Sequence, residues 1–182
     1  QAVWVALAMR QRSLLLMEHI FAEIPAQPEV TSKLPPAPGH TTSAGTHYHL
    51  SGPEDGELVV LIHGIGVFGS QSWAPLAAEL AGGGFRVLTF DFLGRGWSAR
   101  GDGPADFTAD GHLKQLQQLL QDLTLGKTAH HVVAHSMGGI VGVLHTVDPS
   151  TEVLSLTLLA PAGALRKPPD AVTAFILRRC CC

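Results

Sequence analysis

The stretch VVAHSMGGIVG, residues 132–142, has a serine between a β-rich run and an apolar helical pattern, with almost no residues left for a loop. A chain that turns this sharply from strand to helix holds its central residue in a strained conformation and lifts the side chain above the sheet. The turn needs small neighbours, and Ala134, Gly138 and Gly139 meet that need. Because a helix begins directly behind Ser136, its free N–H groups would face an oxyanion formed there. The stretch predicts a nucleophilic serine; the alternative is a serine that only caps the helix.

The sequence around this turn alternates strand-like and helix-like segments. Strands are expected at 46–50, 58–62, 85–90, 130–135 and 153–160. Helices are expected from an N-cap at Ser72 to the glycines at 82–84, and at 108–123 and 137–147. The alternation predicts βαβ units, and so an α/β fold with a mostly parallel sheet and flanking helices. Such sheets bind ligands at the carboxyl ends of their strands.

Two more strand ends carry glycine-rich sequence. HGIG (63–66) follows the first buried strand, and D-x-x-G-x-G-x-S (91–98) follows the next. The glycines of 64–69 also fit G-x-G-x-x-G, and Asp91 lies about 20 residues on, where a ribose-binding carboxylate would stand. In a dinucleotide-binding fingerprint the glycines open the helix directly, whereas here the helix is expected only near Ser72. A dinucleotide-binding domain is therefore kept as an alternative.

In chain order, HGIG, the Asp91 motif and AHSMGG resemble the amino-terminal part of an α/β-hydrolase fold protein of the serine esterase or lipase type. The resemblance spans about residues 45–165, and its one departure is Ala134, where many members have Gly. It implies that Ser136 attacks a carboxylic ester or a lipid-like acyl substrate and forms an acyl-enzyme. Dehalogenases and epoxide hydrolases of this fold usually carry Asp at the elbow, so Ser136 argues against those activities.

The resemblance also assigns the residues around the serine. The backbone N–H groups of Ile65 and Met137 are expected to form the oxyanion hole. Structural support is expected from four residues, His63, Gly64, Asp91 and Gly138. The implied partner is a small-molecule ester or lipid-like substrate, with no cofactor and no metal.

A serine nucleophile needs a base, and the order in this fold is Ser, then Asp or Glu, then His. The only histidine after Ser136 is His145, nine positions along the same helix and roughly 13 Å away, so we expect a packed or surface role for it. His135 is expected to point away from the serine, and Asp170 has no histidine to orient. No triad acid or base is found. We expect the sequence to be truncated before the last strands and therefore to be catalytically inactive. A further alternative is a non-catalytic binding protein on the same fold.

Composition limits the remaining possibilities. The chain has 182 residues, 46% of them hydrophobic. Its formal charge of -3 argues against nucleic acid as a partner. Its ten histidines show no metal-ligand spacing, which argues against a metal site. We expect an N-terminal extension and proline-rich linker at 1–44, a partial hydrolase core at 45–167, and a possible start of a lid helix with a cysteine tail at 168–182. Cys180, Cys181 and Cys182 cannot cross-link a core.

The termini leave the localisation open. The chain opens at Gln1, which suggests that its natural start is missing, and the basic opening fits either a targeting remnant or an amphipathic helix packed on the domain. A soluble intracellular protein is the default expectation, and only the termini hint weakly at membrane association.

Overall fold

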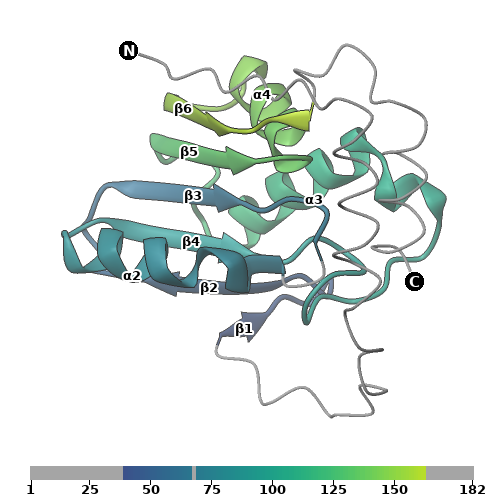
Figure 1. The fold of residues 1–182 in the computed structure, drawn as a ribbon, viewed down its shortest axis with the longest axis horizontal. Helices are drawn as coiled ribbons and strands as arrows, with labels where there is room; N and C mark the ends of the chain where they lie inside the picture. The colour runs from purple at the N-terminus through teal and green to yellow at the C-terminus, as the bar shows by residue number, and fades with distance from the viewer. Residues whose placement is uncertain (1–38, 67–68, 163–182) are drawn as a thin grey trace, which may run out of the picture. The chain divides into compact units, whose positions relative to one another are not determined.

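The structure is a computed structural model that describes residues 39–66 and 69–162 (Figure 1). The expected N-terminal segment, most of the proline-rich linker, the lid helix and the cysteine tail lie outside these residues. The elements in chain order are β1 (His40–Thr41), β2 (His47–Ser51), β3 (Leu58–Ile62), η1 (Gly69–Trp73), α2 (Ala74–Gly82), β4 (Arg86–Phe90), η2 (Pro104–Phe107), α3 (Ala109–Asp122), β5 (His130–His135), α4 (Gly138–Val147) and β6 (Val153–Leu159).

The strands form one sheet in the order β1-β2-β4-β3-β5-β6. β4, β3, β5 and β6 run parallel to one another, whereas β2 is antiparallel to β4 and β1 is antiparallel to β2. The predicted α/β fold with a mostly parallel sheet is therefore confirmed. All five residues of β3 are buried, as expected for a continuous apolar run in the middle of a sheet covered on both faces.

Helices cover the two faces unequally. α2 lies on one face, and α3 and α4 lie on the other (Figure 1). The larger core cluster fills the space under α3 and α4, with buried members Val60, Ile62, Leu88, Phe90, Leu116, Leu119, Val132 and Val141. The smaller cluster lies under α2 and includes Val59, Leu61, Trp73, Ala77 and Val87. Alternate residues of β3 therefore serve different cores, which fixes the register of the sheet.

Two local predictions were wrong. Ser72 is not a helix N-cap, because it lies within the 3-10 turn η1 and its Oγ donates to the Gly69 carbonyl at 2.8 Å, while α2 begins at Ala74. β1 lies within the stretch expected to be irregular, where it pairs His40 with Tyr48 at the sheet edge. Within the described residues, no helix combines the length and the apolar character that crossing a membrane requires.

Candidate active site

The turn at Ser136 joins β5 to α4 at the carboxyl end of the parallel strands. Ser136 has a φ of 51°, in the left-handed region that L-residues with side chains rarely adopt, so the predicted backbone strain is confirmed. Hydrogen bonds hold the turn in place: the Ser136 N–H donates to Leu159 O at 3.0 Å, and its carbonyl accepts from Gly139 N and Ala162 N at 3.0 and 2.9 Å.

Gly138 brings the first turn of α4 against the end of β3. A Cβ at this position would collide with the carbonyl oxygen of His63 and lie 2.7 Å from that of Ile62. Only glycine lets the two backbones approach this closely. The serine turn and the loop after β3 are therefore held next to each other.

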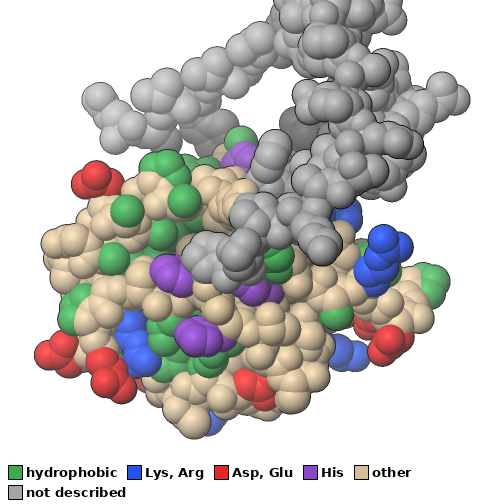
Figure 2. Space-filling view, turned by 90° about the horizontal axis from the view of Figure 1, so that it is seen from below, with side chains coloured by type: hydrophobic (Ala, Val, Ile, Leu, Met, Phe, Trp, Pro, Cys, Tyr) green, Lys and Arg blue, Asp and Glu red, His purple; other side chains and the backbone are tan. Residues whose placement is uncertain are grey.

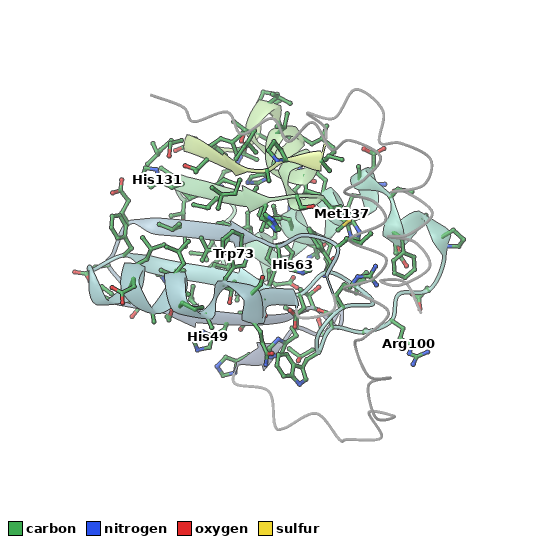
Figure 3. The ribbon with its side chains drawn as sticks, viewed as in Figure 1. His49, His63, Trp73, Arg100, His131 and Met137 are labelled. Atoms are coloured by element: carbon green, nitrogen blue, oxygen red, sulfur yellow. The ribbon has the colours of Figure 1, made fainter. Side chains whose placement is uncertain are left out.

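The loop after β3 contacts the serine directly. A Cβ at Gly64 would lie 3.0 Å from Ser136 Cβ. The Arg95 Nε–H donates to the Ile65 carbonyl at 3.1 Å, which orients the loop from outside. Within residues 39–66 and 69–162, the N–H groups of Ile65 and Met137 donate to no other group. Figure 3 places His63 and Met137 at the same end of the sheet.

His63 holds this loop as a neutral imidazole. The Phe92 N–H donates to His63 Nε2 at 2.9 Å, so this nitrogen carries no proton. The proton is then on Nδ1, which donates to the Gly64 carbonyl at 2.6 Å. Burial lowers the pKa of His63 to about 4, which keeps the ring neutral near pH 7. Both ring nitrogens are in use, so His63 cannot act as a base for Ser136.

Asp91 is a buried anchor for the loops around the site. Its carboxylate accepts from Ser70 N at 2.6 Å and Trp97 N at 3.0 Å, and lies 3.2 Å from His47 Nδ1. Gly69 and Gly96 have φ values of 50° and 49°, and a Cβ at either would collide with this carboxylate. Because the carboxylate is fully buried and engaged by these groups, it is not free to bind a ribose, which removes the main support for the dinucleotide interpretation.

A small pocket of about 190 Å³ opens at Ser136. Its lining comes from the loop after β3, η1 and the serine turn: His63, Gly64, Ile65, Gly66, Gly69, Ser72, His135 and Ser136. His135 also lines this pocket, and no hydrogen bond among the described residues joins it to Ser136. His135 follows the alternation of β5 to the α2 face, where its ring lies 6.4 Å from that of Trp73 and its Nδ1 lies 3.2 Å from the position of a Gly64 Cβ.

His145 has the packed role that the sequence suggested. It is fully buried, and its Nε2 lies 2.9 Å from Nε2 of His130 at the opposite end of β5. It cannot serve Ser136 as a base. In the part of the chain that the structure describes, no three His, Cys, Asp or Glu side chains gather as metal ligands.

Sequence reasoning missed three supporting residues: Arg95, His47 and Gln115. Gln115 donates from Nε2 to the Asp91 carbonyl at 2.9 Å and accepts from Leu93 N at 3.0 Å. A signal for Gln115 was present, because this polar residue lies on the apolar face of α3, among buried Leu116 and Leu119. Arg95 and His47 gave no such signal, since their contacts depend on the fold of the Asp91 loop.

Comparison with known proteins agrees with this architecture. The family model described as alpha/beta hydrolase fold matches residues 57–177. A putative carbamate hydrolase, RutD of Variovorax paradoxus, is 35% identical over 62% of this chain and 41% of its own length. A probable lysophospholipase, BODYGUARD 1 of Arabidopsis thaliana, is 33% identical over 68% of this chain and 26% of its own.

A solved carboxylesterase structure from Nitrososphaera gargenis aligns with a TM-score of 0.64 and 22% identity, over 78% of this chain and 51% of that chain. At this identity it supports the fold alone. The chain spans less than half the length of the two curated relatives named above. The family match covers more than half of the chain. The strand order of the sheet and the sharp turn at Ser136 agree with that match. The chain therefore belongs to the α/β-hydrolase family.

Proposed function

We propose that this protein is a serine hydrolase of carboxylic esters or lipid-like acyl compounds, with Ser136 as nucleophile. Ser136 Oγ would bond to the substrate carbonyl carbon while a base takes the hydroxyl proton. The alcohol would then leave with a proton, and water would release the acyl group from Ser136. The observation that carries the proposal is the strained Ser136, held against Gly64 in a small pocket in a chain of this family.

The oxyanion hole is assigned to the backbone N–H groups of Ile65 and Met137. Ile65 lines the pocket with Ser136, and Met137 follows Ser136 in the chain. Neither N–H donates to another described residue, which supports their assignment to a developing negative charge. A single donor of this kind contributes roughly 10²–10³-fold to the rate in serine proteases. Gly64, Gly138, His63 and Asp91 are assigned the role of holding these donors in place.

The base and acid are assigned to parts of the protein outside residues 39–66 and 69–162. Both nitrogens of His63 are occupied, and His145 pairs with His130. His135 lines the pocket, but neither of its nitrogens hydrogen-bonds to Ser136 in the structure. The described residues are therefore proposed to supply the nucleophile and the oxyanion donors, but not the base.

The substrate class rests on the nucleophile and on the relatives. A serine hydroxyl attacks carbonyl carbon, and the two curated relatives are named for carbamate and lysophospholipid hydrolysis. These names, taken with the serine, support a small-molecule acyl substrate here.

The test is labelling with a fluorophosphonate, mapped by intact mass and peptide analysis. Labelling of the 182-residue chain is expected to be slow, because a positioned base contributes roughly 10²–10⁴-fold. Added imidazole should accelerate it, and the label should map to Ser136. Ser136→Ala should abolish the labelling, while Ser72→Ala, a serine lining the same pocket, should keep it.

Two results would contradict parts of this proposal. Labelling that survives in Ser136→Ala would remove Ser136 as the nucleophile. Rapid labelling at Ser136 without imidazole would show that the chain carries its own base.

The second candidate is a non-catalytic binding protein on the same fold, favoured by the lack of a paired base among the described residues. A fold alone does not decide function. Ser136 that stays unlabelled even with imidazole would support this candidate.

A further inference from the structure

A second pocket lies between α2 and β2, and it shares no lining residue with the pocket at Ser136. We call it the α2–β2 pocket. Its volume is about 330 Å³, at the lower end of the range for sites that bind small molecules. Most of the surface inside it is apolar, because one side is formed by alanines of α2. The lining includes Ala74, Ala77, Ala78, Ala81, His47 and Trp97.

His47 brings a hydrogen-bond acceptor to this pocket. The residue is only 3% exposed, and its Nδ1 lies 3.2 Å from the Asp91 carboxylate. A carboxylate only accepts, so Nδ1 carries the proton and Nε2 of the neutral ring is an acceptor. Nε2 has no hydrogen-bond partner among the described residues. Gly39 has no side chain to cover this nitrogen, since a Cβ there would lie 3.1 Å from it.

Trp97 brings a hydrogen-bond donor to the same pocket. Its backbone N–H donates to Asp91 at 3.0 Å, and its ring lies 5.3 Å from the His47 ring between centroids. The indole Nε1 is buried and has no partner within residues 39–66 and 69–162. An indole N–H can only donate. One unused acceptor and one unused donor therefore lie side by side, and leaving both buried without partners is unfavourable.

We propose that the α2–β2 pocket binds a small phenol, whose hydroxyl bonds to both nitrogens. The O–H would donate to His47 Nε2, and the oxygen would accept from Trp97 Nε1–H. A carboxylate cannot donate to Nε2, and an ammonium cannot accept from the indole, whereas a hydroxyl does both. The aromatic body of the ligand would lie against the alanine methyl groups and the Trp97 ring, where its apolar surface leaves water.

The surface around the pocket suits an uncharged ligand. Figure 2 views the molecule from the side of β1 and β2 and shows histidine side chains next to hydrophobic ones on this face. Exposed His49, Ala74 and Ala78 line the pocket, so it opens to the surface here. The described lining residues include no Lys, Arg, Asp or Glu. A neutral phenol can therefore enter without leaving a charge unpaired.

The experiment titrates para-ethylphenol into the 182-residue chain and follows the indole N–H signals by proton–nitrogen correlation NMR. The chain has three tryptophans, and Trp97→Phe identifies the Trp97 signal by its loss. This signal is expected to shift and to saturate. Para-ethyltoluene has a methyl group in place of the hydroxyl and should bind at least about fivefold more weakly, since it makes neither bond. Equal affinities would overturn recognition of a hydroxyl, and a Trp97 signal that stays fixed up to about 5 mM para-ethylphenol would overturn the proposal.

Two alanine variants locate the binding. Ala78→Leu extends a side chain into the pocket from an exposed position on α2 and should weaken para-ethylphenol binding at least about tenfold. Ala105→Leu is the matched control, because Ala105 is exposed on η2, does not line this pocket and should leave binding unchanged. Unchanged binding in Ala78→Leu would overturn the location. Circular dichroism would confirm that each variant folds. Ser136→Ala should bind like the wild type, so this test is independent of the proposed hydrolase activity.

Discussion

Acidification from pH 7.5 to pH 5 is expected to destabilise the protein by about 2 kcal/mol through one side chain, His145. His145 lies on α4 and is fully buried. Its Nε2 lies 2.9 Å from Nε2 of His130, the first residue of β5. His130 Nδ1 lies 2.8 Å from the Thr128 carbonyl, so it must carry a proton and donate it. His130 Nε2 is then the acceptor, and His145 Nε2–H is the donor. His145 Nδ1 is then unprotonated and buried, with no hydrogen-bond partner among the described residues.

Protonation of His145 would place an N–H and a positive charge in this site. Burial lowers the pKa of His145 from 6.5 to about 4, with His130 acting in the same direction and Asp148 opposing it. The unfolded chain therefore binds the proton more tightly, so stability falls as the pH drops below about 6.5 and the loss levels off near pH 4. The full difference is about 3 kcal/mol, of which about 2 kcal/mol develops by pH 5.

The measurement compares urea unfolding of the wild type and His145→Gln at several pH values from 7.5 to 5. Gln can still donate to His130 but cannot titrate, so the variant should lose about 2 kcal/mol less than the wild type over this range. His49→Gln, at an exposed position on β2, is the control and should keep the wild-type pH dependence. Parallel pH profiles for wild type and His145→Gln would refute this account of the pair.

Two substitutions at the serine turn test its strain and its packing. Ser136→Gly should stabilise the protein by about 0.5–1 kcal/mol in urea unfolding. Gly adopts a φ of 51° without the conformational energy that a residue with a Cβ loses there. A loss of stability would contradict the strain argument. Gly138→Ala should destabilise the protein by about 1–3 kcal/mol, because its Cβ meets the His63 and Ile62 carbonyls. Gly66→Ala should stay within about 0.5 kcal/mol, because its Cβ would have no atom of the described, non-adjacent residues within 4 Å; equal effects of the two would refute the close-approach argument.

The elements that could be predicted from sequence are those whose pattern is local. The apolar run 58–62, the strand 130–135 and the helix expected at about 108–123 all occur close to the predicted bounds, since hydrophobic periodicity depends on neighbours in the chain. The backbone conformation of Ser136 could also be predicted from its neighbours in the chain, because small residues at this spacing permit few other turns. The predicted helix N-cap at Ser72 was wrong because the local pattern did not decide the structure there. A 3-10 turn that buries Trp73 occupies the place of the expected first helical turn.

The candidate site was only partly predictable, because its contacts join distant segments. Asp91 was identified as a support, but its partners Ser70 and His47 come from different parts of the chain, and no spacing rule connects them. That His135 lines the pocket could not be predicted, because this depends on which face of β5 continues into the pocket. Arg95 could not be assigned, since its bond to the Ile65 carbonyl exists only once two loops have folded together.

These contacts explain how the residues of the proposed catalytic site around Ser136 are organised. Ser136 is fixed by bonds to Leu159, Gly139 and Ala162, all of which lie within the described part of the chain. The loop opposite is fixed by His63 and Arg95, and its neighbours are fixed by Asp91. None of these bonds involves a group that would take a proton from the serine. Placement of Ser136, the proposed nucleophile, and of the proposed oxyanion donors therefore rests on this sheet and its loops. Under the proposed function, a base has only to reach a hydroxyl that is already in position.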